Sequence, residues 1–308
     1  MSKINIPEAL FLLNNHHVVA IPTETVYGLA ARYDDEVAIE KIFAEKKRPK
    51  SDPLIVHVGH RDQVKELIKS PHPFLLHLMD EFWPGPLTLL AYKKKSVLDI
   101  VTANSLKVAI RMPSHPVALE ILQKLNIPLV APSANLFGHT SPTTFEHVEK
   151  EFKGTIPIVD GGPCTQGIES TILEFQEISP KKAKIILHRP GPLTASMIEK
   201  EIIKFPHLNI SIEEQFSSLQ APGTMESHYA PRIPLYLIDE GDDDGHEIKL
   251  PMKAAEAAEQ LYALLREGEE SQKSYLWIKK RPLQEYQEDP LWASVWNRLL
   301  KASSPLPS

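Results

Sequence analysis

The sequence of 308 residues has a single cysteine, Cys164, so no disulfide can form within the chain. This scarcity fits a reducing compartment and leaves no cysteine set for a structural zinc site. Cys164 lies in the loop-like run DGGPCTQG, without a nearby histidine or second cysteine to activate it. A bystander cysteine is therefore favoured over a catalytic thiol.

The sequence also lacks a run of 18 apolar residues, the length that a membrane-spanning helix needs. The first 17 residues, MSKINIPEALFLLNNHH, hold a short apolar stretch with one nearby lysine and no small-residue cleavage pattern. They predict a first helix rather than a signal peptide. We therefore expect a cytoplasmic protein without a membrane partner.

An excess of positive charge is missing too. The formal net charge is −6, with 24 basic against 23 acidic side chains in residues 1–207 and 10 against 17 in residues 208–308. An overall basic nucleic-acid-binding protein is therefore not indicated. Clusters of cations must be judged one at a time.

Familiar catalytic motifs are absent. Neither phosphate-binding pattern, GxxxxGK[ST] or GxGxxG, occurs, and there is no HExxH metal motif. The acidic residues Asp52, Asp160 and Glu169 are dispersed, so no nucleophile, base and orienting group stand together. If phosphates bind, side-chain cations and hydroxyls must hold them, and covalent catalysis is not favoured.

What the sequence does contain is a dense stretch from Val18 to His57. An apolar run leads into the polar turn Pro22-Thr23-Glu24-Thr25, and apolar residues then recur at helical spacing: Val37, Ile39, Ile42 and Phe43. Pro49 discourages helix at Arg48, so Lys46-Lys47-Arg48 should end the helix in an extended loop before the apolar run that carries His57. Cations here also complement the helix dipole, and taken alone that interpretation outweighs a ligand site.

Strands and helices alternate along the rest of the chain, though not strictly, which favours a mixed, curved α/β sheet over a purely parallel one. Residues 208–232 have few large apolar side chains and predict a linker. Strand and helix patterns then resume. We expect a first domain over residues 1–207, a linker over 208–232 and a small second α/β domain over 233–308.

Polar side chains follow several of the predicted strands: Thr23 and Thr25, Arg111, Ser133 and Asn135, and Ser170 and Thr171. Each alone is ordinary turn or capping chemistry. If those strand ends converge, together with the cations near Arg48, they form a cavity suited to an anionic ligand that carries an amino or carboxylate group. His57 is equally consistent with a half-buried strand residue.

Taken together, these segments resemble a known family. The sequence contains, in the family's order, IPTETVYGLAA, Lys46-x-Arg48, PLIVHV, FWPGPLTLL, VAIRMPSHP, APSAN, SPTT, DGG with GIESTIL, and HRPG. This series resembles the YrdC-like family of threonylcarbamoyl-adenylate synthases. PGTMESHYAPRIPLYLI and LWASVWNRLLKAS are similar to the linker, first strand and last helix of its longer, two-domain branch.

The resemblance implies a YrdC-like curved mixed sheet with flanking helices, joined by a lid-like linker to a small Rossmann-like α/β domain. It also implies a nucleotidyltransferase reaction. L-threonine, bicarbonate (or CO2) and ATP with Mg2+ give threonylcarbamoyl-AMP and pyrophosphate, with no organic cofactor. The product goes to the machinery that modifies adenosine next to the anticodon of tRNA; whether this chain contacts tRNA weakly itself stays open.

The family pattern implies roles for individual residues. Lys46 and Arg48 would be the catalytic cations on the phosphates, and no protein metal site is implied. The ATP-binding set would be Lys46, Arg48, Asp52, Lys107, Ser133, Asn135, Ser141, Arg189 and Tyr229. The threonine-binding set would be Thr25, His57, Arg111, Ala131 and Ser170. We expect Lys46 and Arg48 to face solvent and Tyr229, from the linker, to close over the nucleotide.

Two departures and two alternatives remain. Asp52 stands where relatives often have asparagine, and its carboxylate could either repel ATP or recruit Mg2+. The run GDDDG replaces part of the second domain, which looks shortened. One alternative function is an RNA-binding module of the same fold without adenylation, which the near-neutral first domain disfavours. The other is a carbamoyltransferase-type module, which usually adds zinc-finger-like cysteine sets.

Overall fold

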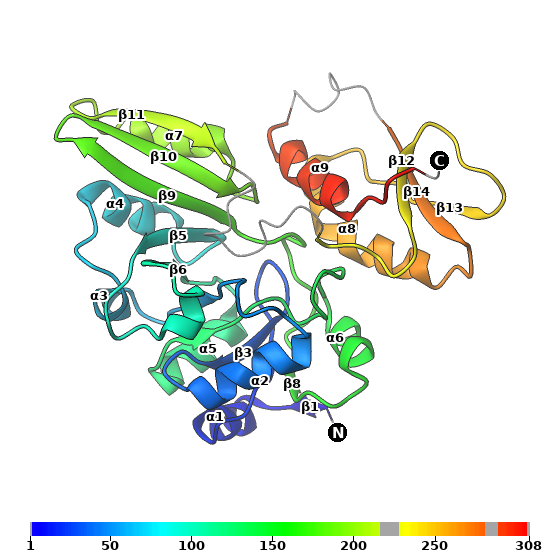
Figure 1. Cartoon of the computed structure of the whole chain (residues 1–308), viewed down its shortest axis with the longest axis horizontal. Coiled ribbons are helices and arrows are strands. Elements are labelled where there is room, and N and C mark those ends of the chain that lie inside the picture. The colour runs from blue at the N-terminus through cyan, green and yellow to red at the C-terminus, as the bar shows by residue number, and fades with distance from the viewer. Residues whose placement is uncertain (1, 216–227, 281–288, 307–308) are drawn as a thin grey trace.

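The computed structural model describes residues 2–215, 228–280 and 289–306. Over these ranges a large mixed sheet runs through the first domain, with both parallel and antiparallel neighbours (Figure 1). Its strands lie in the order β1 (Lys3–Ile4), β8 (Ile158–Val159), β2 (Val19–Ile21), β3 (Gly28–Arg32), β7 (Leu129–Val130), β4 (Ile55–His57), β6 (Lys107–Arg111), β5 (Leu87–Tyr92), β9 (Thr171–Ser179), β10 (Lys182–Arg189) and β11 (Asn209–Glu214). The mixed α/β sheet expected from the sequence is confirmed.

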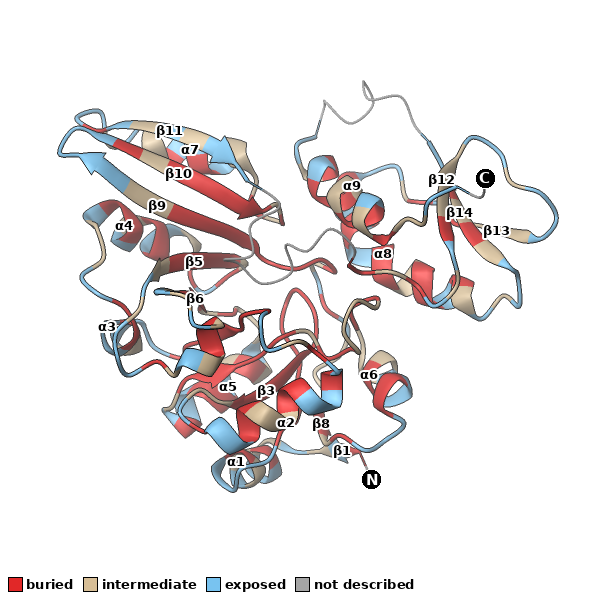
Figure 2. Ribbon diagram, in the orientation of Figure 1, coloured by how far each residue is buried: buried red, intermediate tan, exposed pale blue. Residues whose placement is uncertain are grey.

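Helices cover both faces of this sheet because its strands are apolar on both sides. The helices of the first domain are α1 (Ile6–Asn14), α2 (Glu36–Lys46), α3 (Val64–Leu67), α4 (Pro73–Phe82), α5 (Pro116–Leu125), α6 (Phe145–Phe152) and α7 (Ala195–Ile202), with 3-10 turns at Arg61–Gln63 and Asp99–Thr102. α1 and α5 pack with Val19 and Ile21 in one core, whereas α2, α4 and α6 pack with Ala20 in another. This alternation follows from the two-residue period of a strand, and Figure 2 shows the buried strands between the exposed outer faces of the helices.

The second domain is a small parallel sheet with two helices. Its strands lie in the order β12 (Leu235–Ile238), β14 (Tyr275–Lys279) and β13 (Gly245–Glu247), and the helices are α8 (Ala254–Glu269) and α9 (Leu291–Ala302). Both helices lie on the side of this domain that faces the first domain (Figure 1). Their buried residues, such as Leu261, Val295 and Leu299, form one core with Val26 and Ile168 of the first domain.

Four strands were not expected from the sequence: the short strands β1 and β13, and the longer strands β3 and β11. β3 was not expected, because Gly28–Arg32 has small apolar residues without alternation; it is buried on both faces and pairs antiparallel with β2. The linker was expected from residue 208, but Asn209–Glu214 forms β11, parallel to β10. That edge strand buries only one side, through Ile210 and Ile212, so its signal was weak. Residues 216–227 of the predicted linker lie outside the described residues.

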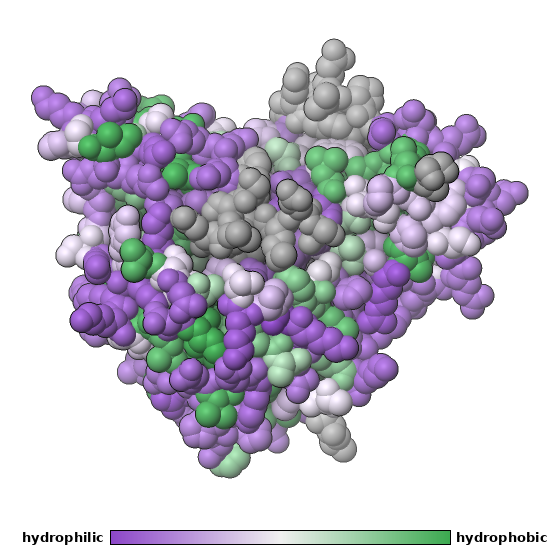
Figure 3. Space-filling model, in the orientation of Figure 1, coloured by the Kyte–Doolittle hydropathy of each residue, from purple (hydrophilic) through white to green (hydrophobic). Residues whose placement is uncertain are grey.

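The outer surface is dominated by polar side chains. Figure 3 shows a mostly hydrophilic face on which apolar side chains form small scattered groups. Within the described ranges, no helix is long and apolar enough to span a membrane.

Candidate active site

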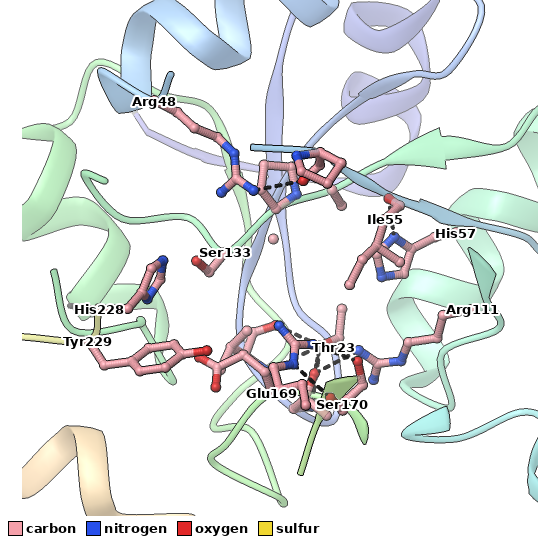
Figure 4. Close-up of a pocket in the computed structure, with 17 residues that line it drawn as sticks. Thr23, Arg48, Ile55, His57, Arg111, Ser133, Glu169, Ser170, His228 and Tyr229 are labelled. Carbon is pink, nitrogen blue, oxygen red and sulfur yellow. Dashed lines mark hydrogen bonds between the residues drawn. The ribbon is translucent and has the colours of Figure 1, made fainter. Parts of the chain in front are cut away.

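Predicted residues from distant parts of the chain line one cavity between the ends of several strands (Figure 4). Nine of the fourteen expected ligand-binding residues are among its lining: Thr25, Arg48, His57, Arg111, Ala131, Ser133, Ser170, Arg189 and Tyr229. Counted together with the open solvent at its mouth, the space has a volume of about 560 Å³. Arg48 and Arg111 lie on different sides of it, so two anionic groups can be held apart.

The side that contains Arg111 is built by two parallel strands. β4 and β6 pair in register, so His57 lies directly opposite Arg111 at the strand ends. The Arg111 guanidinium donates from Nη1 to Thr25 Oγ1 at 2.9 Å and from Nε to the Gly85 carbonyl at 3.2 Å, and its Nη2 lies 2.6 Å from Glu24 Oε1. These contacts fix the plane of the guanidinium and leave part of its five-donor fork for a ligand carboxylate.

His57 is a neutral group in this setting. Burial, reinforced by the nearby Arg111 charge, lowers its pKa to about 3, while its Nδ1 lies 3.2 Å from the Ile55 carbonyl oxygen. A neutral imidazole can both accept and donate a hydrogen bond. His57 therefore suits a ligand with an amino or hydroxyl group better than an additional anion.

The polar turn after β2 is a folded unit. Thr23 Oγ1 donates to the Val26 carbonyl at 2.6 Å and lies 2.9 Å from Thr25 Oγ1, which places the Thr25 hydroxyl beside Arg111. Gly28 follows at the start of β3, where an added Cβ would lie 3.1 Å from the Ala131 Cβ. The close approach that glycine permits brings this turn against the segment that carries Ala131 and Ser133.

On the opposite side, Arg48 is held by its own loop. α2 ends at Lys46, and Lys47 adopts a left-handed conformation (φ 51°) that turns the chain into the cavity wall. The Arg48 guanidinium donates to the Pro53 carbonyl at 2.7 Å and lies 2.9 Å from Asp52 Oδ2. Arg48 is only 8% exposed, so the expectation that it faces bulk solvent was wrong.

Lys46 is also buried, at 1% exposure, contrary to the sequence prediction. Its Nζ donates to the carbonyl oxygens of Ser133 at 2.6 Å and Asn135 at 2.5 Å. Burial, followed by the charge of Arg48, lowers the Lys46 pKa well below its usual value. The prediction was wrong because the last turn of α2 packs against the 133–135 loop, and the Lys46 side chain supports that loop through these two hydrogen bonds. Lys46 is therefore absent from the cavity lining.

A third group of residues closes the cavity on the side of the second domain. Arg189 donates from Nε to the Ser170 carbonyl at 2.9 Å and from Nη2 to Ser170 Oγ at 3.0 Å. Tyr229 is buried beside it, and burial, followed by the Glu169 charge, raises the tyrosine pKa to about 12. Tyr229, labelled in Figure 4, and Arg189 both line the cavity.

The other predicted residues do not line the cavity. Asp52 pairs with the lining residue Arg48, the Asn135 carbonyl accepts from Lys46, and the Ser141 hydroxyl donates to Glu169 Oε1 at 2.7 Å. Lys107 is at the opposite end of β6 from Arg111, with its Nζ 2.5 Å from Glu174 Oε1. The structure therefore does not bring Lys107 to the cavity, because three residues of extended strand lie between it and Arg111.

Two lining residues with ionisable side chains, Glu169 and His228, were not predicted as site residues from the sequence. Both adjoin a predicted residue, Ser170 and Tyr229 respectively, so the motifs GIEST and SHYAP held the signal. Burial lowers the His228 pKa to about 3, and its ring packs edge-on against Phe137 and Tyr229. Thr23, which the sequence analysis placed among the polar residues at strand ends, also lines the cavity, and the remaining unpredicted lining residues are Val26, Gly28, Pro53, Ile55 and Pro132.

The carboxylates near the cavity are paired with arginines, Asp52 with Arg48, Glu169 with Arg298 and Glu24 with Arg111. Among the described residues, the group with metal-ligand geometry is His77, Glu81 and Glu201, outside the cavity lining.

Two protein-family models match the sequence. Residues 12–191 match the Sua5–YciO–YrdC family model, described as telomere recombination. The chain belongs to this family. Residues 193–250 and 245–304 match a second model, described as the C-terminal domain of threonylcarbamoyl-AMP synthase, so the two-domain branch expected from the sequence is confirmed.

Named relatives support the same grouping. The threonylcarbamoyl-AMP synthase of Bacillus subtilis (strain 168) is 42% identical over 236 residues, which cover 76% of this chain and 66% of the relative. That of Schizosaccharomyces pombe is 34% identical over 259 residues, covering 75% of this chain and 62% of the relative. This member of the Sua5–YciO–YrdC family thus spans slightly less than two thirds of these curated relatives.

A solved structure covers more of the chain. The crystal structure of P. abyssi Sua5 complexed with L-threonine aligns over 98% of this chain and 96% of its own, with a TM-score of 0.82 and 31% identity. Both domains of this family member therefore have counterparts in one known structure.

Proposed function

We propose that the protein is an L-threonylcarbamoyladenylate synthase, a nucleotidyltransferase that uses L-threonine, bicarbonate (or CO2) and MgATP. The observation that carries the proposal is one cavity with Arg48 and Arg111 on different sides and with Arg189 also in its lining. The relatives named threonylcarbamoyl-AMP synthase and the L-threonine complex of P. abyssi Sua5 support it. One amino-acid carboxylate and one phosphate chain are anions that such a cavity can hold together.

The reaction needs positioning more than a protein nucleophile. The threonine amine adds to the carbon of CO2 or bicarbonate to give a carbamate, with loss of a proton or water. A carbamate oxygen then attacks the α-phosphorus of ATP, the bond from that phosphorus to the bridging oxygen breaks, and pyrophosphate leaves. Fixed cations that stabilise the charge on the phosphates, and a cavity that excludes water from the labile carbamate, supply most of the catalysis.

The residues divide naturally between the two substrates. Arg111, with the Thr25 hydroxyl beside it, would hold the threonine carboxylate, and the neutral His57 would hydrogen-bond to the amino acid. Arg48, Arg189, Ser133 and Tyr229 would hold the nucleotide. Lys46 would act through the 133–135 loop rather than on a phosphate, because both of its described acceptors are backbone carbonyls of that loop.

The wider setting follows from the same proposal. Threonylcarbamoyl-AMP is a reactive mixed anhydride, so a transferase must take it over and modify adenosine next to the anticodon of tRNA. We propose a cytoplasmic location on the same basis. The roles of Asp52, Lys107, Asn135 and Ser141 toward ATP stay predictions.

The test is pyrophosphate release from ATP by the purified protein with Mg2+, with and without L-threonine and bicarbonate. We expect release that requires both, and that fails when serine or glycine replaces threonine at equal concentration. Folded protein without threonine-dependent release would contradict the proposal. Salt-sensitive tRNA binding in that same sample would support the RNA-binding alternative.

A further inference from the structure

One buried carboxylate, that of Glu169, contacts residues of both domains. Glu169, in the cavity lining, receives hydrogen bonds from three elements: Ser141 Oγ of the first domain at 2.7 Å, Tyr262 of α8 at 3.0 Å to each oxygen, and Arg298 Nε of α9 at 3.1 Å. Glu169 is 6% exposed and Arg298 is 0% exposed. A carboxylate with that many partners is a rigid junction between domains.

α9 reaches both segments that supply this side of the cavity. Arg298 Nη2 donates to the Glu169 carbonyl at 3.2 Å and Nη1 to the Pro190 carbonyl, while Ser294 Oγ donates to the Gly191 carbonyl at 2.9 Å. Glu169 immediately precedes Ser170, and Pro190 immediately follows Arg189. The second domain therefore contacts the backbone immediately before Ser170 and immediately after Arg189, both of which are predicted ligand-binding residues.

The negative charge of Glu169 affects the neighbouring arginines as well as the packing between the domains. Burial alone would raise the Glu169 pKa, but the charges of Arg298 and Arg189 and the Ser141 hydroxyl hold it below its usual value, so the group is a carboxylate. A buried carboxylate that loses its cation draws on the nearest remaining one. Here that cation is Arg189, which lines the cavity, donates to Ser170 Oγ and already acts on the Glu169 carboxylate through its charge.

We propose that Arg298 and Tyr262 of the second domain are positioning residues for the nucleotide side of the cavity. Arg298 neutralises Glu169, so the positive charge of Arg189 stays available to the phosphates, and Tyr262 fixes the carboxylate on the side away from the cavity. The inference rests on the proposed function, since it assigns Arg189 to ATP. It gives the second domain a defined part in substrate binding.

A second contact between the domains provides a matched control. Arg266 of α8 lies 3.2 Å from Glu151 of α6 and donates to the Thr140 carbonyl, so it is also a buried arginine that joins the domains through a carboxylate. Neither Arg266 nor Glu151 lines the cavity. A contribution that is only structural would appear equally at Arg298 and Arg266.

The experiment compares wild type with Arg298→Met, Arg266→Met, Glu169→Gln and the double variant Glu169→Gln/Arg298→Met. ATP with Mg2+ and L-threonine are titrated separately by calorimetry, and thermal unfolding reports folding. We expect Arg298→Met to weaken ATP binding about tenfold, as loss of a charge-assisted contact would do. Arg266→Met should change ATP affinity less than about twofold, and threonine affinity should change little in both.

The double variant decides between charge and packing. Without the carboxylate, Glu169 no longer draws on the charge of Arg189, so we expect Glu169→Gln/Arg298→Met to bind ATP within about threefold of wild type. If it binds as weakly as Arg298→Met, or if Arg266→Met loses as much, the proposal is overturned. Should Arg298→Met not fold, the double variant and Arg298→Lys, which keeps the charge, carry the same comparison.

The outcome is separable from the proposed reaction. Wild type that binds ATP but releases no pyrophosphate with threonine contradicts the reaction and still allows the positioning test. Wild type that binds no ATP overturns the positioning proposal. Unchanged ATP affinity in a folded Arg298→Met also overturns it, even where wild type performs the reaction.

Discussion

Replacing Lys46 with methionine tests whether this residue acts through the loop it braces. Methionine keeps most of the apolar stem and removes the ammonium, which donates to the carbonyl oxygens of Ser133 and Asn135. The Lys46 carbonyl also accepts from the Phe137 amide at 2.8 Å, so the backbone bond to the loop survives the substitution. The change thus removes the side-chain contacts alone.

The expected loss of stability can be worked out from these contacts. A buried acceptor left without a donor costs about 1–3 kcal/mol, so the two carbonyls together cost about 2–6 kcal/mol. Removing a buried ammonium returns part of this, because burying the charge is itself unfavourable by several kcal/mol. We expect a net decrease of about 2 kcal/mol in the free energy of unfolding and, because Ser133 lines the cavity, a fall of at least tenfold in threonine-dependent turnover.

The assay is urea unfolding followed by tryptophan fluorescence, beside pyrophosphate release. Lys41→Met is the matched control, since Lys41 lies on the same helix and donates to the His16 carbonyl at an exposed site. It should change stability by less than about 0.5 kcal/mol. A Lys46→Met protein as stable and as active as wild type would refute the bracing role.

Three further predictions concern other contacts of the site. Asp52→Asn should lower the KM for ATP several-fold, because it releases Arg48 from a buried carboxylate; a raised KM would instead show that Asp52 recruits Mg2+. Tyr229→Ala should weaken ATP binding more than threonine binding in separate titrations, and equal losses would count against its place over the nucleotide. Burial, followed by neighbouring arginine charges, lowers the Lys301 pKa to about 8 from 10.5. Between these pH values the unfolded chain binds more protons at Lys301 than the folded protein does, so the free energy of unfolding should rise from pH 8 to 10.5. The Lys301→Met variant should lack this increment. Urea unfolding of both proteins across that pH range is the measurement.

The sequence was most informative where periodicity and local signals agree. α5 and α6 are examples, because Pro116 at a first helical position and Thr144 as N-cap mark their starts. The strand Gly28–Arg32 was not predicted, because small residues buried on both faces give neither alternation nor helical spacing. Convergence of His57 and Arg111 was within reach, since both were placed at strand ends.

Other parts of the site depend on contacts that no local pattern contains. The burial of Lys46 follows from how α2 meets the 133–135 loop, and a cationic run looks the same whether it is solvated or enclosed. The partnership of Glu169 with Tyr262 and Arg298 joins residues 93 and 129 positions apart. Such pairings are set by tertiary packing, so single-sequence reasoning identified the motif around Glu169 and missed its partners.

The separation of 129 positions between Glu169 and Arg298 also affects the order of folding during synthesis. Ribosomes add on the order of 5–20 residues per second, so Arg298 is made roughly 6–26 s after Glu169. During that interval the large sheet can pair its strands from β1 to β11, because all of them precede the second domain in the chain. A growing chain would therefore hold a folded first domain whose Glu169 still lacks its arginine, and the nucleotide side of the cavity would reach its final form only when α9 docks.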